Sequence, residues 1–282
     1  MSGTLYIVST PIGNLNDMTP RAVETLANAD FLAAEDTRVC MKLLSHFDIS
    51  KPIVSYYEHT RKQRGDAILA RLLAGESCAL TTDAGTPAIS DPGGELVRQC
   101  REAGVPVKTV PGCCAAVAAF SLSGLFETRF TFEGFLSVTK NVRRKHLESL
   151  VNETRPMIFY EAPHKLKNTL ADFARTFGTD RKLLIARELT KLHEESFETT
   201  IGEAIVKYEA EDPRGEYVLV VHGKPESETE EAPLVDPVEA AYALVQQGMR
   251  PADAARQVSR ELNMPKNAIY RGLLEKTGAD EN

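Results

Sequence analysis

Acidic and turn-forming residues are concentrated in one stretch of the chain, residues 81–94, TTDAGTPAISDPGG. It carries two carboxylates, Asp83 and Asp91, and it follows a short apolar run at residues 78–80. A carboxylate placed directly after a strand, like that of Asp83, can accept a hydrogen bond from a ribose hydroxyl or an amino group. Gly85 would let the backbone pass close to a flat ring. The stretch therefore predicts either an ordinary turn or the wall of a ligand site.

The first 124 residues alternate short β-rich runs with helical stretches, such as those at residues 20–29 and 61–73. This alternation is typical of a parallel sheet, in which ligands gather at the carboxyl ends of the strands. The predicted strands are residues 5–8, 31–34, 52–56, 78–81 and 105–110. We expect the polar loops that follow them to form one edge of the sheet: residues 9–14, 35–38, 58–59, 81–94 and 111–115.

The remainder of the chain predicts a second α/β domain and a helical tail. Residues 129–223 form a mixed sheet in this interpretation, with strands at residues 130–135, 157–160, 182–186 and 217–221 and helices near 140–151, 163–177 and 201–209. An acidic, proline-flanked segment then predicts a linker. The helices after it, at residues 237–247, 250–262 and 266–274, resemble a helix-turn-helix. The predicted domains are residues 1–125, 126–223, 224–235 (linker) and 236–282.

Composition bounds the class of protein. With 43% apolar and 26% charged residues in 282, the chain is typical of a globular protein. No apolar run is long enough for a membrane span and the N-terminus does not have the pattern of a signal peptide, so we expect a cytoplasmic protein without a membrane partner. The five cysteines form no Cys-x-x-Cys pair and the six histidines are scattered, so the sequence predicts no metal site.

Two basic clusters could contact RNA phosphates although the net charge is −7. One opens a predicted helix of the second domain and the other lies in the helical tail. Residues 250–276 hold six Lys or Arg against three Asp or Glu. A solvated surface is the alternative for each cluster, and Tyr270 could either stack on a base or pack in a core. The candidate RNA-binding residues are Lys140, Arg143, Arg144, Lys145, Lys266 and Arg271.

Common nucleotide and hydrolase motifs do not occur. The sequence contains no Gly-x-Gly-x-x-Gly after a strand, no Gly-x4-Gly-Lys-Ser/Thr and no Gly-x-Ser-x-Gly. A phosphate cradle is therefore not indicated. The loops offer carboxylates, hydroxyls and glycines, which suit a polyhydroxyl or amine-bearing ligand.

Six ordered motifs resemble the ribosomal small-subunit methyltransferase I family, which belongs to the tetrapyrrole-methylase-like, S-adenosylmethionine-dependent enzymes. They are STPIGNL at 9–15, AAEDTR at 33–38, DAGTPAISDPG at 83–93, PG at 111–112, FYEAPH at 159–164 and ARELTK at 186–191. The resemblance runs from about residue 4 to 223. It implies two α/β domains of the class III methyltransferase type, a small all-helical C-terminal domain, and a homodimer.

The same resemblance implies 2′-O-methylation of a cytidine ribose in the decoding region of 16S ribosomal RNA, either as naked RNA or in the small subunit. S-adenosylmethionine would bind in a cleft between the two α/β domains. Carried onto this chain, its binding residues are Pro11, Ile12, Gly13, Asn14, Asp83, Gly85, Thr86, Pro87, Cys114, Ala115, Tyr160 and Leu189. Two positions depart from the family pattern: Cys113 stands where Pro is more frequent, and Gly94 where an aromatic residue is frequent.

A ribose hydroxyl that attacks a sulfonium methyl group needs a proton acceptor, while orientation and desolvation supply most of the remaining catalysis. The candidate acceptors are Glu35, Asp36, Asp91, Glu161 and Glu188. Arg38 and Arg187 could hold phosphates or orient these carboxylates. A structural cap or ion pair is the alternative for each acid. Two other functions stay open: a methyltransferase of the same fold that acts on a small molecule such as a tetrapyrrole, and a non-catalytic RNA-binding assembly factor.

Overall fold

The computed structural model describes residues 2–57, 61–225, 236–262 and 264–277. The chain divides into two compact units, Met1–Lys224 and Pro225–Asn282, which are described separately below. The predicted loop at residues 58–59 and most of the predicted linker lie outside the described residues.

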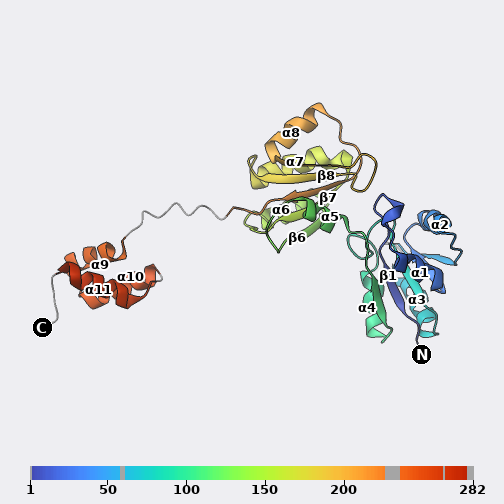
Figure 1. The fold of residues 1–282 in the computed structure, drawn as a ribbon, viewed down its shortest axis with the longest axis horizontal. Helices are drawn as coiled ribbons and strands as arrows, with labels where there is room; N and C mark the ends of the chain where they lie inside the picture. The colour runs from blue at the N-terminus through green and yellow to red at the C-terminus, as the bar shows by residue number, and fades with distance from the viewer. Residues whose placement is uncertain (1, 58–60, 226–235, 263, 278–282) are drawn as a thin grey trace. The chain divides into compact units, whose positions relative to one another are not determined.

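A five-stranded parallel sheet forms the first part of the larger unit, in the order β3-β2-β4-β1-β5. In Figure 1 this part is drawn in blue to blue-green, around the label β1. Its strands are β1 (Leu5–Val8), β2 (Phe31–Ala34), β3 (Ile53–Ser55), β4 (Cys78–Thr81) and β5 (Val107–Val110). All pairings are parallel. The predicted parallel sheet is therefore confirmed, and the polar loops after β1, β2, β4 and β5 share one edge.

Helices cover both faces of this sheet. They are α1 (Pro20–Asn28), α2 (Thr37–His46), α3 (Arg61–Leu73) and α4 (Gly94–Glu102). One apolar core contains Leu26 of α1 and Leu44 of α2, and a second contains Leu72 of α3 and Leu96 of α4. Burial on both faces explains why β2 and β4 are buried along their whole length and, apart from Thr81, apolar rather than alternating.

Helix α2 was not predicted, since residues 35–38 were assigned to a loop. Asp36 is in fact its N-cap, and the Asp36 carboxylate accepts a hydrogen bond from the Arg38 N–H at 2.8 Å. Thr19 caps α1 in the same way, accepting from the Ala22 N–H at 3.2 Å. Both caps satisfy backbone donors that the first helical turn leaves without partners.

A second five-stranded sheet has the order β6-β7-β10-β8-β9. The strands are β6 (Thr131–Phe135), β7 (Met157–Glu161), β8 (Lys182–Arg187), β9 (Glu195–Thr200) and β10 (Tyr217–Val221). β6 and β7 are parallel and the other pairs are antiparallel, so the predicted mixed sheet is confirmed. Strand β9, ESFETT, was not predicted. It pairs only with β8 at the end of the strand order and is polar, so it lacks the apolar run that marks a central strand.

Four helices pack on this second sheet: α5 (Ala115–Leu122), α6 (Lys140–Ser149), α7 (Pro163–Phe177) and α8 (Ile201–Ala210). Leu147 of α6, Phe173 of α7 and Ala204 of α8 share one buried core with strand residues. Ala116 and Ala119 of α5 belong to a different core, with Ile158 and Val220. Helix α5 therefore covers the opposite face from α6, α7 and α8.

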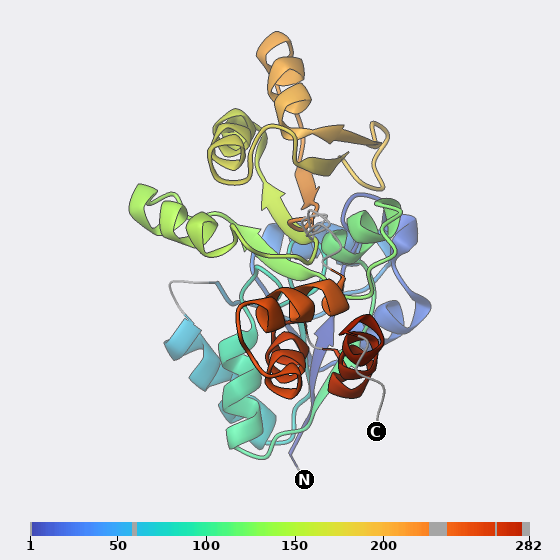
Figure 2. The ribbon, with the colours of Figure 1, turned by 90° about the vertical axis from the view of Figure 1, so that its left-hand side faces the viewer.

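The smaller unit contains α9 (Pro237–Gln246), α10 (Pro251–Glu261) and α11 (Lys266–Thr277), drawn in orange and red in Figure 2. All three helices contribute to one small core, which includes Ala241, Val258 and Leu273. Tyr270 packs against this core and is half-buried, which favours the packing alternative over base stacking. Among the described residues, no helix is both long and apolar enough to cross a membrane.

Candidate active site

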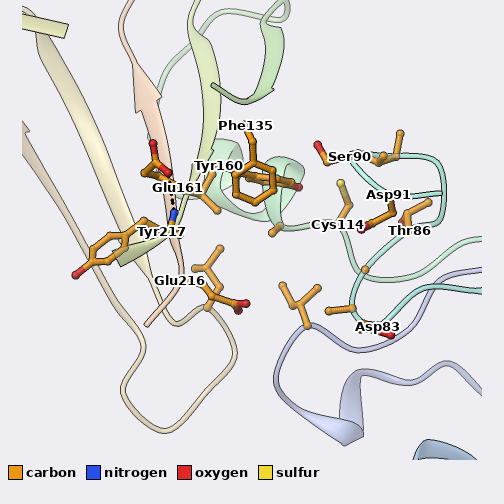
Figure 3. A pocket seen from close by; sticks show the side chains of 18 of the residues that line it. Asp83, Thr86, Ser90, Asp91, Cys114, Phe135, Tyr160, Glu161, Glu216 and Tyr217 are labelled. Atoms are coloured by element: carbon orange, nitrogen blue, oxygen red, sulfur yellow. Dashed lines mark hydrogen bonds between the residues drawn. The ribbon is translucent and has the colours of Figure 1, made fainter. Parts of the chain in front are cut away.

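A pocket of about 500 Å³ lies in the larger unit, lined by the loops that follow strands of both sheets. Its volume is typical of a small-molecule site. Figure 3 shows Asp83, Thr86, Ser90 and Asp91 on the side of the first sheet, and Tyr160, Glu161, Glu216 and Tyr217 on the side of the second. The first set follows β4 at its carboxyl end, as the topology predicts for parallel sheets. In the second set, Tyr160 and Glu161 end β7, whereas Glu216 and Tyr217 lie at the start of the antiparallel strand β10.

The loop after β4 is held to the loop after β1 by a short bridge. The N–H of Thr10 donates to the Gly85 carbonyl at 2.8 Å, and the N–H of Gly85 donates to the Thr10 carbonyl at 3.1 Å. Gly85 has φ of +83°, a backbone region that disfavours any residue with a side chain. Gly85 therefore lets the two loops approach and places both at the pocket.

Thr86 connects three strand ends. Its hydroxyl donates to the Cys113 carbonyl at 2.9 Å, and it lies 2.9 Å from the Ser9 hydroxyl. Because the only hydroxyl hydrogen of Thr86 is engaged with Cys113, Ser9 acts as the donor in the second bond. Further along the same loop, Ala88 and Ser90 have φ of +68° and +63°, which is strained for residues with a side chain. Such strain is frequent where a loop is shaped by function.

Three carboxylates of the first sheet gather beside the pocket: Glu35, Asp83 and Asp91. Burial raises the pKa of Asp91 to about 6, and the negative charge of Glu35 adds to the effect. Burial and the charge of Asp83 also raise the pKa of Glu35, although its carboxylate accepts a hydrogen bond from the Thr82 hydroxyl at 3.3 Å. The pKa of Asp83 is raised by burial as well. A carboxylate with a pKa of about 6 is suited to accepting a proton near neutral pH.

The acids on the side of the second sheet are bound within the protein. Glu161 is only 3% exposed, and its carboxylate accepts from the Ala162 N–H at 2.9 Å and from the Thr169 hydroxyl. Glu188 accepts from Lys191 Nζ at 2.7 Å and from the Glu216 N–H at 3.0 Å. The hydrogen bond from Lys191 lowers the pKa of Glu188. Of these two candidates, only Glu161 lines the pocket.

The other predicted catalytic residues do not line the pocket. Asp36 and Arg38 form a two-pronged ion pair with a shortest distance of 2.6 Å, and the Arg38 side chain is 82% exposed. Arg187 pairs with Glu195 at 3.1 Å. The structural alternative, an ion pair, thus describes the contacts of these three residues.

Tyr160 provides an aromatic wall. Its hydroxyl accepts a hydrogen bond from the Ala116 N–H at 3.0 Å, in the first turn of α5. Its ring makes edge contacts with Phe132 and Phe135, with centroid distances of 5.1 and 5.5 Å. Burial raises the pKa of Tyr160, so the phenol stays neutral and presents a flat, apolar face.

Most of the predicted cofactor-binding residues line this pocket: Ile12, Asp83, Gly85, Thr86, Cys114, Ala115, Tyr160 and Leu189. Pro11 and Gly13 line a second pocket of about 370 Å³. Asn14 and Pro87 line neither of the two, and the Asn14 side chain instead accepts from the Asn16 N–H and caps a short 3-10 helix, η1 (Leu15–Asp17).

The sequence analysis missed several lining residues, among them Ile89, Phe135, His164, Lys191, Glu216 and Tyr217. Phe135 and Glu216 do not lie in any of the six motifs. Only tertiary packing brings β6 and the start of β10 to the pocket. His164 and Lys191 lie at the ends of motifs that were recognised, and their position there was the available signal.

The candidate RNA-binding residues differ in their exposure to solvent and in their contacts within the protein. Lys140, Arg144 and Lys145 are exposed on α6. Arg143 has a side chain only 13% exposed, and its guanidinium donates to Asp172 at 2.5 Å and to the Thr169 hydroxyl at 2.7 Å. On α11, Arg271 is exposed and Lys266 is half-buried. Arg143 is therefore already engaged inside the protein.

Two strand-end walls in a chain of two α/β sheets agree with the class III methyltransferase type that the sequence motifs predict. The model of the Tetrapyrrole (Corrin/Porphyrin) Methylases matches residues 4–205, and the chain belongs to this family. The crystal structure of diphthine synthase superposes with a TM-score of 0.60 at 15% identity, covering 79% of this chain and 90% of that one. Uroporphyrin-III C-methyl transferase from Thermus thermophilus, complexed with S-adenyl homocysteine, gives 0.54 at 18% identity, covering 79% and 98%. At these identities the two superpositions support the fold alone.

Two curated relatives are far closer in sequence. A protein of Synechocystis sp. is 46% identical over 273 residues, covering 97% of this chain and 98% of its own length. A protein of Pasteurella multocida is 43% identical over 282 residues, covering 98% of each chain. Both are named "Ribosomal RNA small subunit methyltransferase I". The resemblance inferred from the six motifs is thereby confirmed.

Proposed function

We propose that this chain uses S-adenosylmethionine to methylate the ribose 2′-hydroxyl of a cytidine in the decoding region of 16S ribosomal RNA. Membership of a methylase family confirms the expected cofactor. The names of the relatives support ribosomal RNA of the small subunit as substrate. The observation that carries transfer to a hydroxyl is Asp91, a half-buried carboxylate in the pocket with a pKa of about 6, because an attacking hydroxyl must lose a proton.

The residues of the pocket fit this cofactor. S-adenosylmethionine has an adenine, a ribose diol, an amine and a carboxylate, but no phosphate. Ile12, Tyr160 and Leu189 offer apolar surface for a flat ring, and Asp83 offers an acceptor for hydroxyls or an amine. The sequence has none of the common phosphate-binding glycine motifs. We assign the cofactor-binding role to the lining residues on these grounds.

When bound, S-adenosylmethionine supplies an electrophilic methyl group. The protein contributes position, exclusion of water and a place for the proton. Asp91 accepts the proton of the ribose hydroxyl as the ribose oxygen gains the methyl group, and it later releases that proton to solvent. Burial, and after it the negative charges of Glu35 and Asp83, keep Asp91 basic enough for this role by raising its pKa.

The exposed cations bind RNA phosphates in this proposal, and the residues assigned are Lys140, Arg144 and Lys145 on α6 and Arg271 on α11. Arg143 instead holds α6 to α7 through Asp172 and Thr169. A homodimer, a cytoplasmic location and domain boundaries near residues 125, 223 and 235 complete the proposal.

A transfer assay tests this function. The purified chain is incubated with S-adenosylmethionine carrying a labelled methyl group and with either naked 16S ribosomal RNA or small subunits lacking ribose methylation. We expect label at one cytidine, located by the resistance of the 2′-O-methylated linkage to alkaline cleavage. Label on a base, or on no RNA at all, contradicts the proposal. A parallel reaction with a tetrapyrrole acceptor tests the small-molecule alternative, and calorimetry with S-adenosylmethionine tests the non-catalytic one.

A further inference from the structure

A second pocket of about 370 Å³ adjoins the cofactor pocket. The two share the lining residues Ile12, Asp83, Ala84, Lys191 and Glu216, so they meet along a common wall. The remaining lining of the second pocket comes from the loop after β1, from α2 and from the end of β4. Four of the predicted cofactor-binding residues, Pro11, Ile12, Gly13 and Asp83, also line it, but none of the residues that α2 contributes has a role with the cofactor or in catalysis.

The walls of this second pocket combine apolar faces with a polar edge. Leu15, Val39 and Leu43 line it, and Leu15 and Val39 are 41% and 38% exposed. Large apolar side chains that stay this exposed at the lip of a cavity are suited to covering the face of a ligand. Polar groups lie among them: the Thr82 and Asp83 side chains and the amine of Lys42. A flat heterocycle with donors and acceptors around its rim matches this lining.

Other ligand classes fit less well. Two cations line the pocket, and Lys191 is bound to Glu188 at 2.7 Å and to Glu216 at 2.9 Å, so of the two only the exposed Lys42 can face an anion. Asp83 and Glu216 add negative charge at the shared wall, which disfavours a phosphate or a carboxylate there.

We propose that the second pocket receives the target nucleobase, turned out of the RNA, so that its ribose lies at the wall shared with the cofactor pocket. This inference rests on the proposed function. Enzymes that act on a base extrude it into a pocket, and proteins that recognise single-stranded RNA stack its unpaired bases on side chains and read their edges with polar groups. The shared wall carries Asp83, and Glu35 and Asp91 line the same cofactor pocket. A base in the second pocket therefore brings its ribose toward the carboxylates proposed to handle the proton.

The substitution Val39→Trp tests this placement by filling the mouth of the second pocket. Val39 does not line the cofactor pocket, so we expect the affinity for S-adenosylmethionine to stay within about twofold of wild type by calorimetry. The kcat/KM for 16S ribosomal RNA should fall by about 10- to 100-fold, the range given by loss of one stacked base. The milder Val39→Ser removes the apolar face without adding bulk and should give a smaller loss in the same parameter.

Val206→Trp is the matched control, since Val206 is 68% exposed on α8 and lines neither pocket. It should methylate RNA at the wild-type rate. A photocrosslink gives an independent readout: RNA with 4-thiouridine at the target position should crosslink within residues 9–15 or 37–46.

The outcomes separate the two proposals. A wild-type chain that binds S-adenosylmethionine but methylates no RNA overturns the proposed function, and the nucleobase pocket with it. A wild-type chain that methylates RNA, with Val39→Trp and Val39→Ser equally active, overturns the nucleobase pocket alone. Crosslinks confined to other segments do the same.

Discussion

The acids on the two sides of the cofactor pocket differ in the groups that surround them. On the side of the first sheet, burial and neighbouring negative charges raise the pKa values of Glu35, Asp83 and Asp91. On the side of the second sheet, Glu188 is paired with Lys191 and its pKa is lowered. Glu161 is buried and held by two hydrogen bonds. The first wall can therefore exchange a proton, while the second wall holds its shape.

This difference arises because the strand ends of the two sheets place different groups beside the acids. Parallel strand ends of the first sheet bring several acidic loops together at one edge, and the one nearby Arg in these loops, Arg38, is paired with Asp36. At the second wall, Glu161 meets the N–H of Ala162 and the hydroxyl of Thr169 on α7. Glu35 accepts a hydrogen bond from the Thr82 hydroxyl and Asp83 accepts one from the Asp36 N–H, but both donors are neutral, so burial and neighbouring negative charges still raise the pKa values at the first wall. Glu188, on the side of the second sheet, has the Lys191 amine as its donor.

The largest expected effect comes from Asp91→Asn, which removes the proton acceptor and keeps the size of the side chain. We expect kcat for RNA methylation to fall by about 10²- to 10⁴-fold, the usual contribution of a general base. The dissociation constant for S-adenosylmethionine, measured by calorimetry, should change little. A variant with kcat close to that of wild type would assign the proton to another group and remove the contrast between the walls.

A substitution in the second wall should change the stability of the fold rather than the rate of methyl transfer. Thr169→Val removes the hydroxyl that donates to Glu161 and accepts from Arg143, and it leaves a buried carboxylate short of a donor. We expect the free energy of unfolding in urea to fall by about 1–3 kcal/mol. Thr169→Ser retains the hydroxyl and is the control. Equal stability of the Val variant and wild type would show that this network contributes nothing to the rigidity of the wall.

The pH dependence of kcat should follow the ionisation of Asp91 in the first wall. Because the base must be ionised, kcat should fall by about tenfold per pH unit below the Asp91 pKa of about 6 and level off above it. The free energy of unfolding should change with pH in the opposite direction to kcat, because a carboxylate whose pKa is raised on folding favours the folded state while it is protonated. Its contribution is present below the ordinary pKa of 3.8 and is lost as pH rises through about 6. A rate profile that stays flat between pH 5 and 7 would contradict the assignment.

The smallest effect is expected for Glu188→Gln, since the amide still accepts a hydrogen bond from the Glu216 N–H. Loss of the ion pair with Lys191 at the rim should cost less than about 1 kcal/mol of folding free energy. The kcat should stay within about threefold of wild type in the same transfer assay. A loss of kcat as large as that expected for Asp91→Asn would show that the second wall also takes part in the reaction.

Much of the scaffold could be predicted from local pattern. β2 and β4 are continuous apolar runs between turn signals, and they fall at the predicted residues. The start of α1 was marked by Thr19 followed by Pro20. Strand β9 could not be predicted in this way, because an edge strand with polar residues has neither a buried run nor a clear alternation. Its pairing with β8 is a tertiary property.

The sequence by itself determined the family, the parallel sheet and the set of loops that meet at its edge, because these depend on motifs and on local apolar periodicity. Only the tertiary structure ranked the acids within that set. Asp36, Asp91 and Glu161 are all carboxylates near strand ends in the sequence, and nothing local distinguishes them. Packing leaves Asp91 half-buried beside Glu35. The Asp36 carboxylate is paired with Arg38, and the Glu161 carboxylate accepts a hydrogen bond from the Thr169 hydroxyl. For Asp91, burial and the negative charge of Glu35, which lies in a distant segment of the chain, raise the pKa, whereas the partner of Asp36 is an Arg only two residues away.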